Sequence, residues 1–254
     1  MSGGVGVEID DGVAVVTIDR PDVRNAIGST TIAELDAALD RALDAGAAVL
    51  VLRGGGERAF VSGGDLKELA AIRTHDAAVE MASRARQLLD RVAAFPVPVI
   101  AALNGHALGG GAEVAIAADI RIAADDVKIG FNQVSLGIMP AWGGAERLAL
   151  AVGRSRALLA ITTGELYDAP TAQRLGLVDV VVSRAAFDDE WRRLARRMAD
   201  LAPGTTRAVK SVIAAAVPSH HPELEADATT VFAQLWTADA HWAAVEALEQ
   251  KPRP

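Results

Sequence analysis

The chain has 254 residues, of which 51% are hydrophobic and 23% are charged, and it contains no cysteine. This composition is that of a globular protein with a sizeable core, organised as one large domain or two. The lack of cysteine excludes a disulfide framework, a thiolate nucleophile and a Cys-ligated metal site. A net charge of −8 argues against a nucleic-acid or anionic-membrane binder, because both partners require a basic face.

The first fifty residues predict, in order, the strand 5–10, the strand 13–19, a helix from 31 to about 45, and the strand 47–53. The first two strands flank Asp11-Gly12, which is a strong hairpin signal. Thr31 and Glu34 spell the T-x-x-E pattern of a capping box, which predicts the start of the helix.

The rest of the chain predicts mixed structure that becomes mostly helical. Apolar runs predict the strands 97–103, 120–124, 127–131 and 178–182. The helical period predicts helices over 111–117, 143–152, 155–163, 169–175, 185–201, 205–216 and 223–248. We therefore expect an α/β fold over residues 1–200 with a C-terminal helical region over 201–254. No run reaches about 18 apolar residues and no signal peptide is visible, so we expect a cytoplasmic protein with no membrane partner.

Three glycine-rich segments each lead into a predicted helix: 60–66, 104–113 and 136–144. Glycines let backbone N–H groups approach a ligand closely, and three glycines that open a helix make an electropositive pocket for an oxyanion. Asp65 is placed to cap the helix after the first segment. None of the segments matches a G-x-G-x-x-G, Walker or G-x-S-x-G motif, which disfavours a nucleotide-binding protein and a serine hydrolase.

The glycine-rich segments belong to a longer series of motifs. In chain order the motifs are Arg20-Pro21-x-x-x-Asn25-Ala26, Phe60-x-Ser62-Gly63-Gly64-Asp65-Leu66, Asn104-Gly105-x-Ala107-Leu108-Gly109-Gly110-Gly111-Ala112-Glu113, Ala118-Asp119-Ile120-Arg121-Ile122-Ala123, Leu136-Gly137-x-x-Pro140-x-x-Gly143-Gly144, and Gly164 followed by Ala169 to Asp179. As a set they are highly specific, and the sequence resembles the enoyl-CoA hydratase/isomerase (crotonase) superfamily over residues 5–182, about 70% of the chain.

The resemblance implies a spiral of repeated β-β-α units that binds acyl-CoA thioesters. It also implies a homotrimer or a dimer of trimers, whose C-terminal helices cover the acyl-CoA pocket of a neighbouring subunit. No metal or redox cofactor is implied, because coenzyme A is part of the substrate. The family's two oxyanion-hole N–H groups match Gly64 and Gly110, where they would stabilise the thioester oxygen as it gains enolate charge.

Residue matching also suggests where the substrate lies. Four residues are expected along the adenine and pantetheine of CoA: Ser62, Gly63, Asp65 and Leu66. Arg24 is either a phosphate partner or a surface arginine, and Lys251 and Arg253 in the basic tail are further phosphate candidates. Trp142 occupies a position that is commonly small in the family, where it either walls and shortens the acyl pocket or packs under the neighbouring helix.

Hydratases of this family use two carboxylates, and this sequence supplies only one of them. Glu113 matches the first, whereas the second position holds Gln133, whose amide can hold a water but cannot exchange a proton near pH 7. Glu146 and Asp125 lie in adjacent segments. Each either replaces the missing second carboxylate or is a surface charge.

Three hypotheses follow from the single carboxylate. Glu113 alone activates a water that Gln133 positions; or the site isomerises, decarboxylates or hydrolyses an acyl-CoA; or the protein is a non-catalytic acyl-CoA scaffold. We predict the first, hydration of a 2-enoyl-CoA to a 3-hydroxyacyl-CoA.

Overall fold

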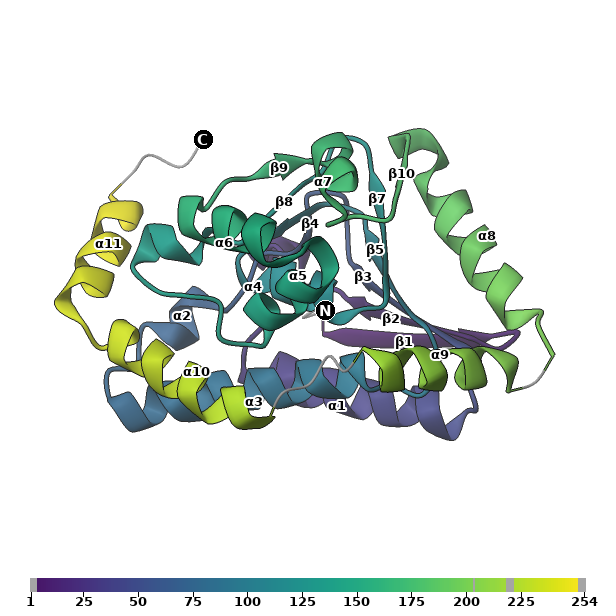
Figure 1. Ribbon diagram of the computed structural model, residues 1–254, viewed down its shortest axis with the longest axis horizontal. Helices are drawn as coiled ribbons and strands as arrows, with labels where there is room; N and C mark the ends of the chain where they lie inside the picture. The colour runs from purple at the N-terminus through teal and green to yellow at the C-terminus, as the bar shows by residue number, and fades with distance from the viewer. Residues whose placement is uncertain (1–3, 203, 218–221, 251–254) are drawn as a thin grey trace.

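The computed structural model describes residues 4–202, 204–217 and 222–250, which form two β-sheets surrounded by helices (Figure 1). The strands are β1 (Val5–Asp10), β2 (Val13–Ile18), β3 (Val49–Gly54), β4 (Ala59–Val61), β5 (Val99–Leu103), β6 (His106–Leu108), β7 (Ile120–Ala124), β8 (Lys128–Gly130), β9 (Tyr167–Asp168) and β10 (Val180–Val182). The α-helices are α1 (Ser29–Asp44), α2 (Leu66–Leu69), α3 (His75–Ala93), α4 (Gly110–Ala117), α5 (Gly144–Val152), α6 (Arg154–Thr163), α7 (Ala169–Leu175), α8 (Phe187–Ala199), α9 (Thr205–Ala216), α10 (Pro222–Trp236) and α11 (Asp239–Glu249). Short 3₁₀ helices are η1 (Pro21–Val23), η2 (Asn132–Leu136) and η3 (Arg184–Ala186).

The two sheets are built by successive strand pairs. The larger sheet has the order β1-β2-β3-β5-β7-β10, in which β1 and β2 are antiparallel and the other neighbours are parallel. The smaller sheet has the order β4-β6-β8-β9 and is parallel except for β8 and β9. In the pairs β3-β4, β5-β6 and β7-β8, the first strand enters the larger sheet, the second enters the smaller one, and a helical segment follows. This arrangement confirms the predicted spiral of β-β-α units.

The first hairpin forms as predicted, but the predicted capping box does not. Asp11 and Gly12 have φ angles of 44° and 77°, the left-handed pair that a tight type I′ turn requires. Helix α1 begins two residues before Thr31, whose hydroxyl accepts a hydrogen bond from the Arg20 guanidinium instead. The carboxylate of Glu34 accepts from the backbone N–H of Val5 on β1. Both side chains therefore bind residues outside α1, just after β2 and on β1, and neither caps the helix.

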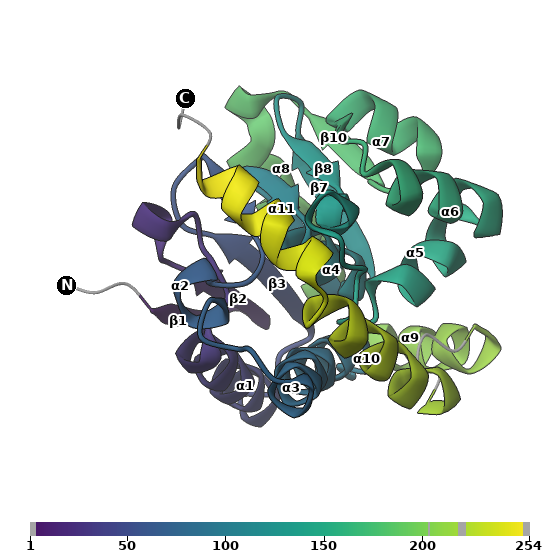
Figure 2. The same cartoon turned by 90° about the vertical axis from the view of Figure 1, so that its left-hand side faces the viewer.

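Helices surround the sheets, and the last two helices pack on elements from the middle of the chain. Helix α8 packs on β2, β3 and β7, and α1 packs on β1 and β2 with α3 beside it (Figure 1). Helix α10 lies along α3 (Figure 1), and α11, which follows α10 (Figure 2), packs against η2. The single helix predicted over 223–248 is thus two helices, separated at Thr237 and Ala238. In the part of the chain that is described, no helix is both long and apolar enough to cross a bilayer.

The core around α4 consists of small side chains. Fully buried alanines line this helix and the strands beside it: Ala101, Ala102, Ala112, Ala115, Ala123 and Ala124. A Cβ on Gly111 would lie 1.8 Å from the carbonyl oxygen of Val61 on β4, so no side chain fits there. The close approach brings the N-terminus of α4 directly to the end of β4.

Candidate active site

Glu113 lies in the first turn of α4, and only 2% of its surface is exposed. Its Oε2 accepts hydrogen bonds from the backbone N–H groups of Trp142 (2.8 Å) and Gly144 (3.0 Å). Its Oε1 accepts from Gln133 Nε2 at 3.0 Å. The carboxylate is therefore held on both oxygens, and Oε1, with one partner, keeps a lone pair available.

Opposing effects set the protonation of Glu113. Burial raises its pKa from 4.5 to about 7, and the nearby negative charge of Glu146 acts in the same direction. The hydrogen bonds from Gly144, Trp142 and Gln133 favour the ionised form and limit this rise in the pKa. A carboxyl group with a pKa near 7 is suited to both taking and giving a proton at neutral pH.

Gln133 lies on η2, where the sequence predicted a partner for Glu113. Its side chain is buried, and its Oε1 has no hydrogen-bond partner among the described residues. The two functional groups that the motifs predicted at separate points of the chain are thus in direct contact.

Two glycine-rich loops meet at the N-terminus of α4. A Cβ on Gly63 would lie 3.3 Å from the nitrogen of Gly110, and a Cβ on Gly110 would lie 3.1 Å from Gly63 Cα. The N–H groups of Gly64 and Gly110 donate no hydrogen bond to any residue in the described ranges, and both glycines are partly exposed. The contact brings the loop that carries Gly64 to the loop that carries Gly110.

Trp142 lies beside this contact. The Trp142 side chain is buried, and a Cβ added to Gly110 would lie only 2.4 Å from its Cζ3 atom. The structure therefore sets the ring against Gly110, the residue expected to supply an oxyanion donor. The backbone of the same tryptophan binds Glu113, so one residue contacts both parts of the site.

The residues predicted to contact CoA lie along the loop before α2. Asp65 caps that helix through Lys67 N (3.2 Å) and pairs with Arg20 (3.0 Å), so its side chain serves the loop's own structure. Leu66 is 60% exposed. Ser62 N donates to the carbonyl of Arg24, which brings that exposed arginine beside the loop. Lys251 and Arg253 lie outside the described residues.

Both alternative carboxylates are bound to other groups. Glu146 accepts a hydrogen bond from the buried Arg86 at 2.8 Å. Asp125 is exposed and accepts from Arg184 N at 2.9 Å. Both therefore serve structural contacts.

Sequence reasoning missed a cluster of charges on α3 and α5. Arg147 is buried, and it donates to the carbonyl of Trp142 at 2.9 Å. It also pairs with Asp90, which in turn pairs with Arg86. The charges on α3 are more than 50 residues from those on α5, and each helix alone has the pattern of an amphipathic surface helix.

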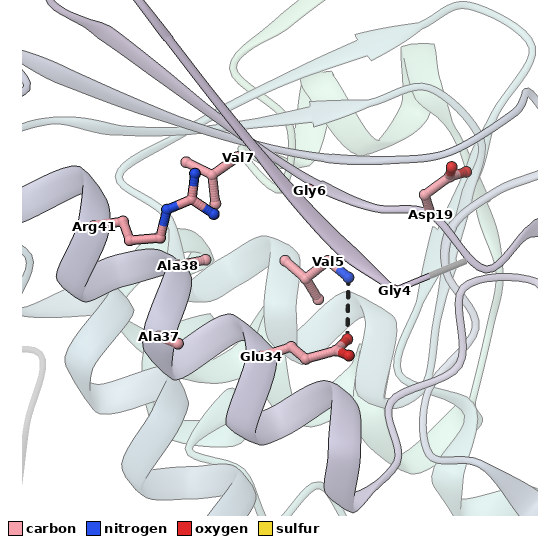
Figure 3. A pocket seen from close by; sticks show the side chains of 9 residues that line it. All are labelled: Gly4, Val5, Gly6, Val7, Asp19, Glu34, Ala37, Ala38 and Arg41. Carbon is pink, nitrogen blue, oxygen red and sulfur yellow. Dashed lines mark hydrogen bonds between the residues drawn. The ribbon is translucent and has the colours of Figure 1, made fainter. Parts of the chain in front are cut away.

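A surface hollow of about 440 Å³ between β1 and α1 is separate from these residues (Figure 3). Its lining residues are Gly4, Val5, Gly6, Val7, Asp19, Glu34, Ala37, Ala38 and Arg41. None of them is a predicted site residue, and the one hydrogen bond drawn across it joins Val5 N to Glu34.

The β-β-α spiral and the buried carboxylate beside two glycine loops define an acyl-CoA enzyme of the crotonase type. The profile of the family described as "Enoyl-CoA hydratase/isomerase" matches residues 8–252, and the chain belongs to that family. It is 34% identical to a probable enoyl-CoA hydratase of Bacillus subtilis, over 98% of this chain and 97% of the relative. It is 36% identical to the short-chain-enoyl-CoA hydratase of Clostridium acetobutylicum, over 82% and 79% of the two chains.

Solved structures agree with this assignment. The enoyl-CoA hydratase of Bacillus anthracis superposes with a TM-score of 0.81 and 29% identity, over 99% of this chain and 98% of that one. An enoyl-CoA hydratase/isomerase of Xanthobacter autotrophicus superposes with a TM-score of 0.86 and 27% identity over 100% of both chains.

Proposed function

We propose that this enzyme adds water across the double bond of a 2-enoyl-CoA to give a 3-hydroxyacyl-CoA. The observation that carries the proposal is the pairing of Glu113 with Gln133, which leaves Gln133 Oε1 buried and without a described partner. The opposite amide orientation would set an oxygen against the carboxylate, so an ionised Glu113 selects the one observed. Adjacent acceptors on a glutamate and a glutamine suit a water molecule, which has two hydrogens to donate.

The proposed chemistry needs one carboxylate. Ionised Glu113 takes a proton from the water while the water oxygen bonds to C3 of the substrate. The double-bond electrons move toward the thioester carbonyl, whose oxygen gains enolate charge. Protonated Glu113 then delivers the proton to C2, which restores both the thioester and the enzyme.

The oxyanion donors of this mechanism are the N–H groups of Gly64 and Gly110. Loss of one such donor typically raises a barrier by about 3–4 kcal/mol. Their lack of partners among the described residues supports this role. The ring of Trp142 against Gly110 and the name of one relative, the short-chain-enoyl-CoA hydratase of Clostridium acetobutylicum, support a short enoyl chain that ends beside Trp142.

The test is the loss of enoyl-thioester ultraviolet absorbance when the purified protein meets crotonyl-CoA, with Gln133→Glu measured alongside. Rapid loss with the natural protein is the expected result. Activity in Gln133→Glu alone would contradict hydration as the natural reaction. Binding of acyl-CoA with no turnover of an enoyl-CoA, a β,γ-enoyl-CoA or a malonyl-type CoA would instead identify a scaffold.

Double-bond isomerisation is the second candidate function. One carboxylate is enough to move a proton between two carbons of the same substrate, and Glu113 has a pKa of about 7. A β,γ-enoyl-CoA assay separates the two activities, because isomerisation creates the absorbing conjugated thioester and hydration removes it.

The assembly and location are also proposals. Four exposed apolar residues lie on one side of α9 and the turn after it: Val209, Val212, Ile213 and Val217. Such a surface supports burial in a homotrimer or dimer of trimers. A cytoplasmic location and a reaction without a metal or redox cofactor remain predictions from the sequence.

A further inference from the structure

The turn formed by residues 141–144 is bound on two opposite sides. On one side, Trp142 N and Gly144 N donate to Glu113 Oε2 at 2.8 and 3.0 Å. On the other side, the carbonyl of Trp142 accepts from Arg147 Nη1 at 2.9 Å. The peptide that carries this carbonyl lies between the two donors, so its orientation determines whether both N–H groups reach one oxygen.

Arg147 fits tightly against this turn. Gly143 has a φ of 85°, and a Cβ on it would lie 2.4 Å from Arg147 Nη1. The guanidinium therefore occupies the space that a side chain at position 143 would need, and the left-handed backbone there also favours glycine.

A chain of ion pairs between α3 and α5 holds the Arg147 guanidinium in place. Its Nη2 pairs with Asp90 on α3, which also pairs with Arg86, and Arg86 binds Glu146. Arg147 and Arg86 are 4% and 2% exposed. Buried ion pairs contribute little net stability compared with apolar side chains of the same volume, so stability alone gives no reason for two buried arginines behind a catalytic carboxylate.

We propose that Arg147 is a positioning residue for the hydration reaction: through the turn 141–144 it holds Glu113 Oε2, and so directs Oε1 to the water and substrate. Arg147 itself does not touch the reacting atoms. The proposal rests on the proposed function for its kinetic consequence, but the geometry of the carboxylate exists without substrate.

The experiment compares Arg147→Met and Arg147→Lys with Arg121→Met. Arg121 is a matched control, because it is also buried and also binds one backbone carbonyl (Ala118, 3.0 Å) and one carboxylate (Asp179, 2.7 Å), neither of which belongs to the site. Arg147→Met removes both the positive charge that acts on Glu113 and the group that holds the turn, and each loss disfavours ionised Glu113, so the acid limb of kcat moves to higher pH. Arg147→Lys keeps the charge, so a shift in that variant reports the loss of the turn's geometry. We expect kcat to fall about tenfold at pH 7 and about twofold at pH 9, with little change in KM. Arg147→Lys, which keeps one donor, should lie between.

A second readout does not depend on turnover. The ¹³C carboxyl signal of Glu113, assigned by its absence in Glu113→Gln, should titrate at a higher pH in Arg147→Met than in the natural protein and should be unmoved in Arg121→Met. An unchanged titration in folded Arg147→Met or Arg147→Lys overturns the positioning role. If the natural protein does not hydrate enoyl-CoA while the titration moves as expected, the proposed function fails, and what stands is that Arg147 holds the Glu113 carboxylate through the turn 141–144.

Discussion

At the scale of single residues, burial raises the pKa of Glu113 and its hydrogen bonds lower it. Its pKa of about 7 means that the ionised form, which takes the proton from water, increases as the pH rises through neutrality. We therefore expect kcat/KM for crotonyl-CoA to rise with pH and to level off above about pH 8. A rate that is constant from pH 5 to pH 9 would contradict Glu113 as the base.

Glu113→Gln should abolish turnover and preserve the fold. The new amide can accept from Trp142 N and Gly144 N through its oxygen, and Gln133 can turn its own amide to accept from the new NH₂ group. Loss of acid–base help lowers kcat by about 10²–10⁴-fold, while acyl-CoA affinity stays close to that of the natural protein. Retained turnover would refute the role of Glu113.

The same variant also tests the raised pKa through stability. Because the folded-state pKa of Glu113 lies above its unfolded value of 4.5, its stabilising contribution is present below about pH 4.5 and is lost as the pH rises through about 7. As the pH rises from 5 to 8, the free energy of unfolding of Glu113→Gln should increase relative to that of the natural protein, by about 3 kcal/mol at most. Urea unfolding of both proteins at each pH measures the difference, and Arg121→Gln shows no such pH trend.

The resemblance to the enoyl-CoA hydratase/isomerase family was sufficient to place Glu113 and Gln133 in one site, because both positions belong to motifs of that family. It was not sufficient for Arg147 and Asp90. Their contact depends on how α3 packs against α5, and a charge on an amphipathic helix has the same local pattern whether it faces water or a buried partner. Asp65 illustrates both cases: its cap was predictable, and its pairing with Arg20 was not.

At the scale of elements, the last two helices hold η2 in place. His241 at the start of α11 donates from Nδ1 to the carbonyl of Leu136 at 2.7 Å, and its ring contacts those of Trp236 and Trp242, which also contact each other. Its backbone packs against Gly137 directly after η2. Helix α11 thus supports the segment that carries Gln133 within its own chain.

His241→Phe should separate the hydrogen bond from the ring packing. It keeps an aromatic ring in contact with the two tryptophans and leaves the Leu136 carbonyl without its donor, which costs about 1–3 kcal/mol. We expect a lower unfolding temperature and a several-fold fall in kcat, since η2 no longer fixes Gln133. His75→Phe is the control, because His75 is an exposed histidine on α3. Unchanged kcat in a destabilised His241→Phe would show that α11 supports the fold alone.

Three strands that the sequence did not predict are very short. Strands β4, β6 and β9 have two or three residues each, too few to show an alternating pattern. The capping box of α1 failed because Thr31 and Glu34 found partners on other elements, and no local pattern contains those partners.

At the scale of the whole molecule, the exposed apolar side of α9 predicts assembly. Val212→Asp is expected to convert the oligomer to smaller species at micromolar concentration, because an unpaired carboxylate would be buried in the contact. Light scattering measures the mass. Leu43→Asp is the control, on an exposed apolar residue of α1. A natural protein that is already monomeric would refute the trimer.

The alanine-lined core around α4 has a consequence for how this sequence can change over evolution. In a core of large side chains, the common damaging substitutions remove atoms and leave cavities. A Cβ on Gly111 meets the backbone and the Cβ of Val61, which cannot turn aside, and the alanines around α4 are fully buried, so added atoms in this region cause overpacking. Tolerated drift in this region is therefore confined to glycine, alanine and residues of similar volume. We expect changes of side-chain size to be tolerated best at exposed positions such as Leu66, which is 60% exposed and lies outside this core.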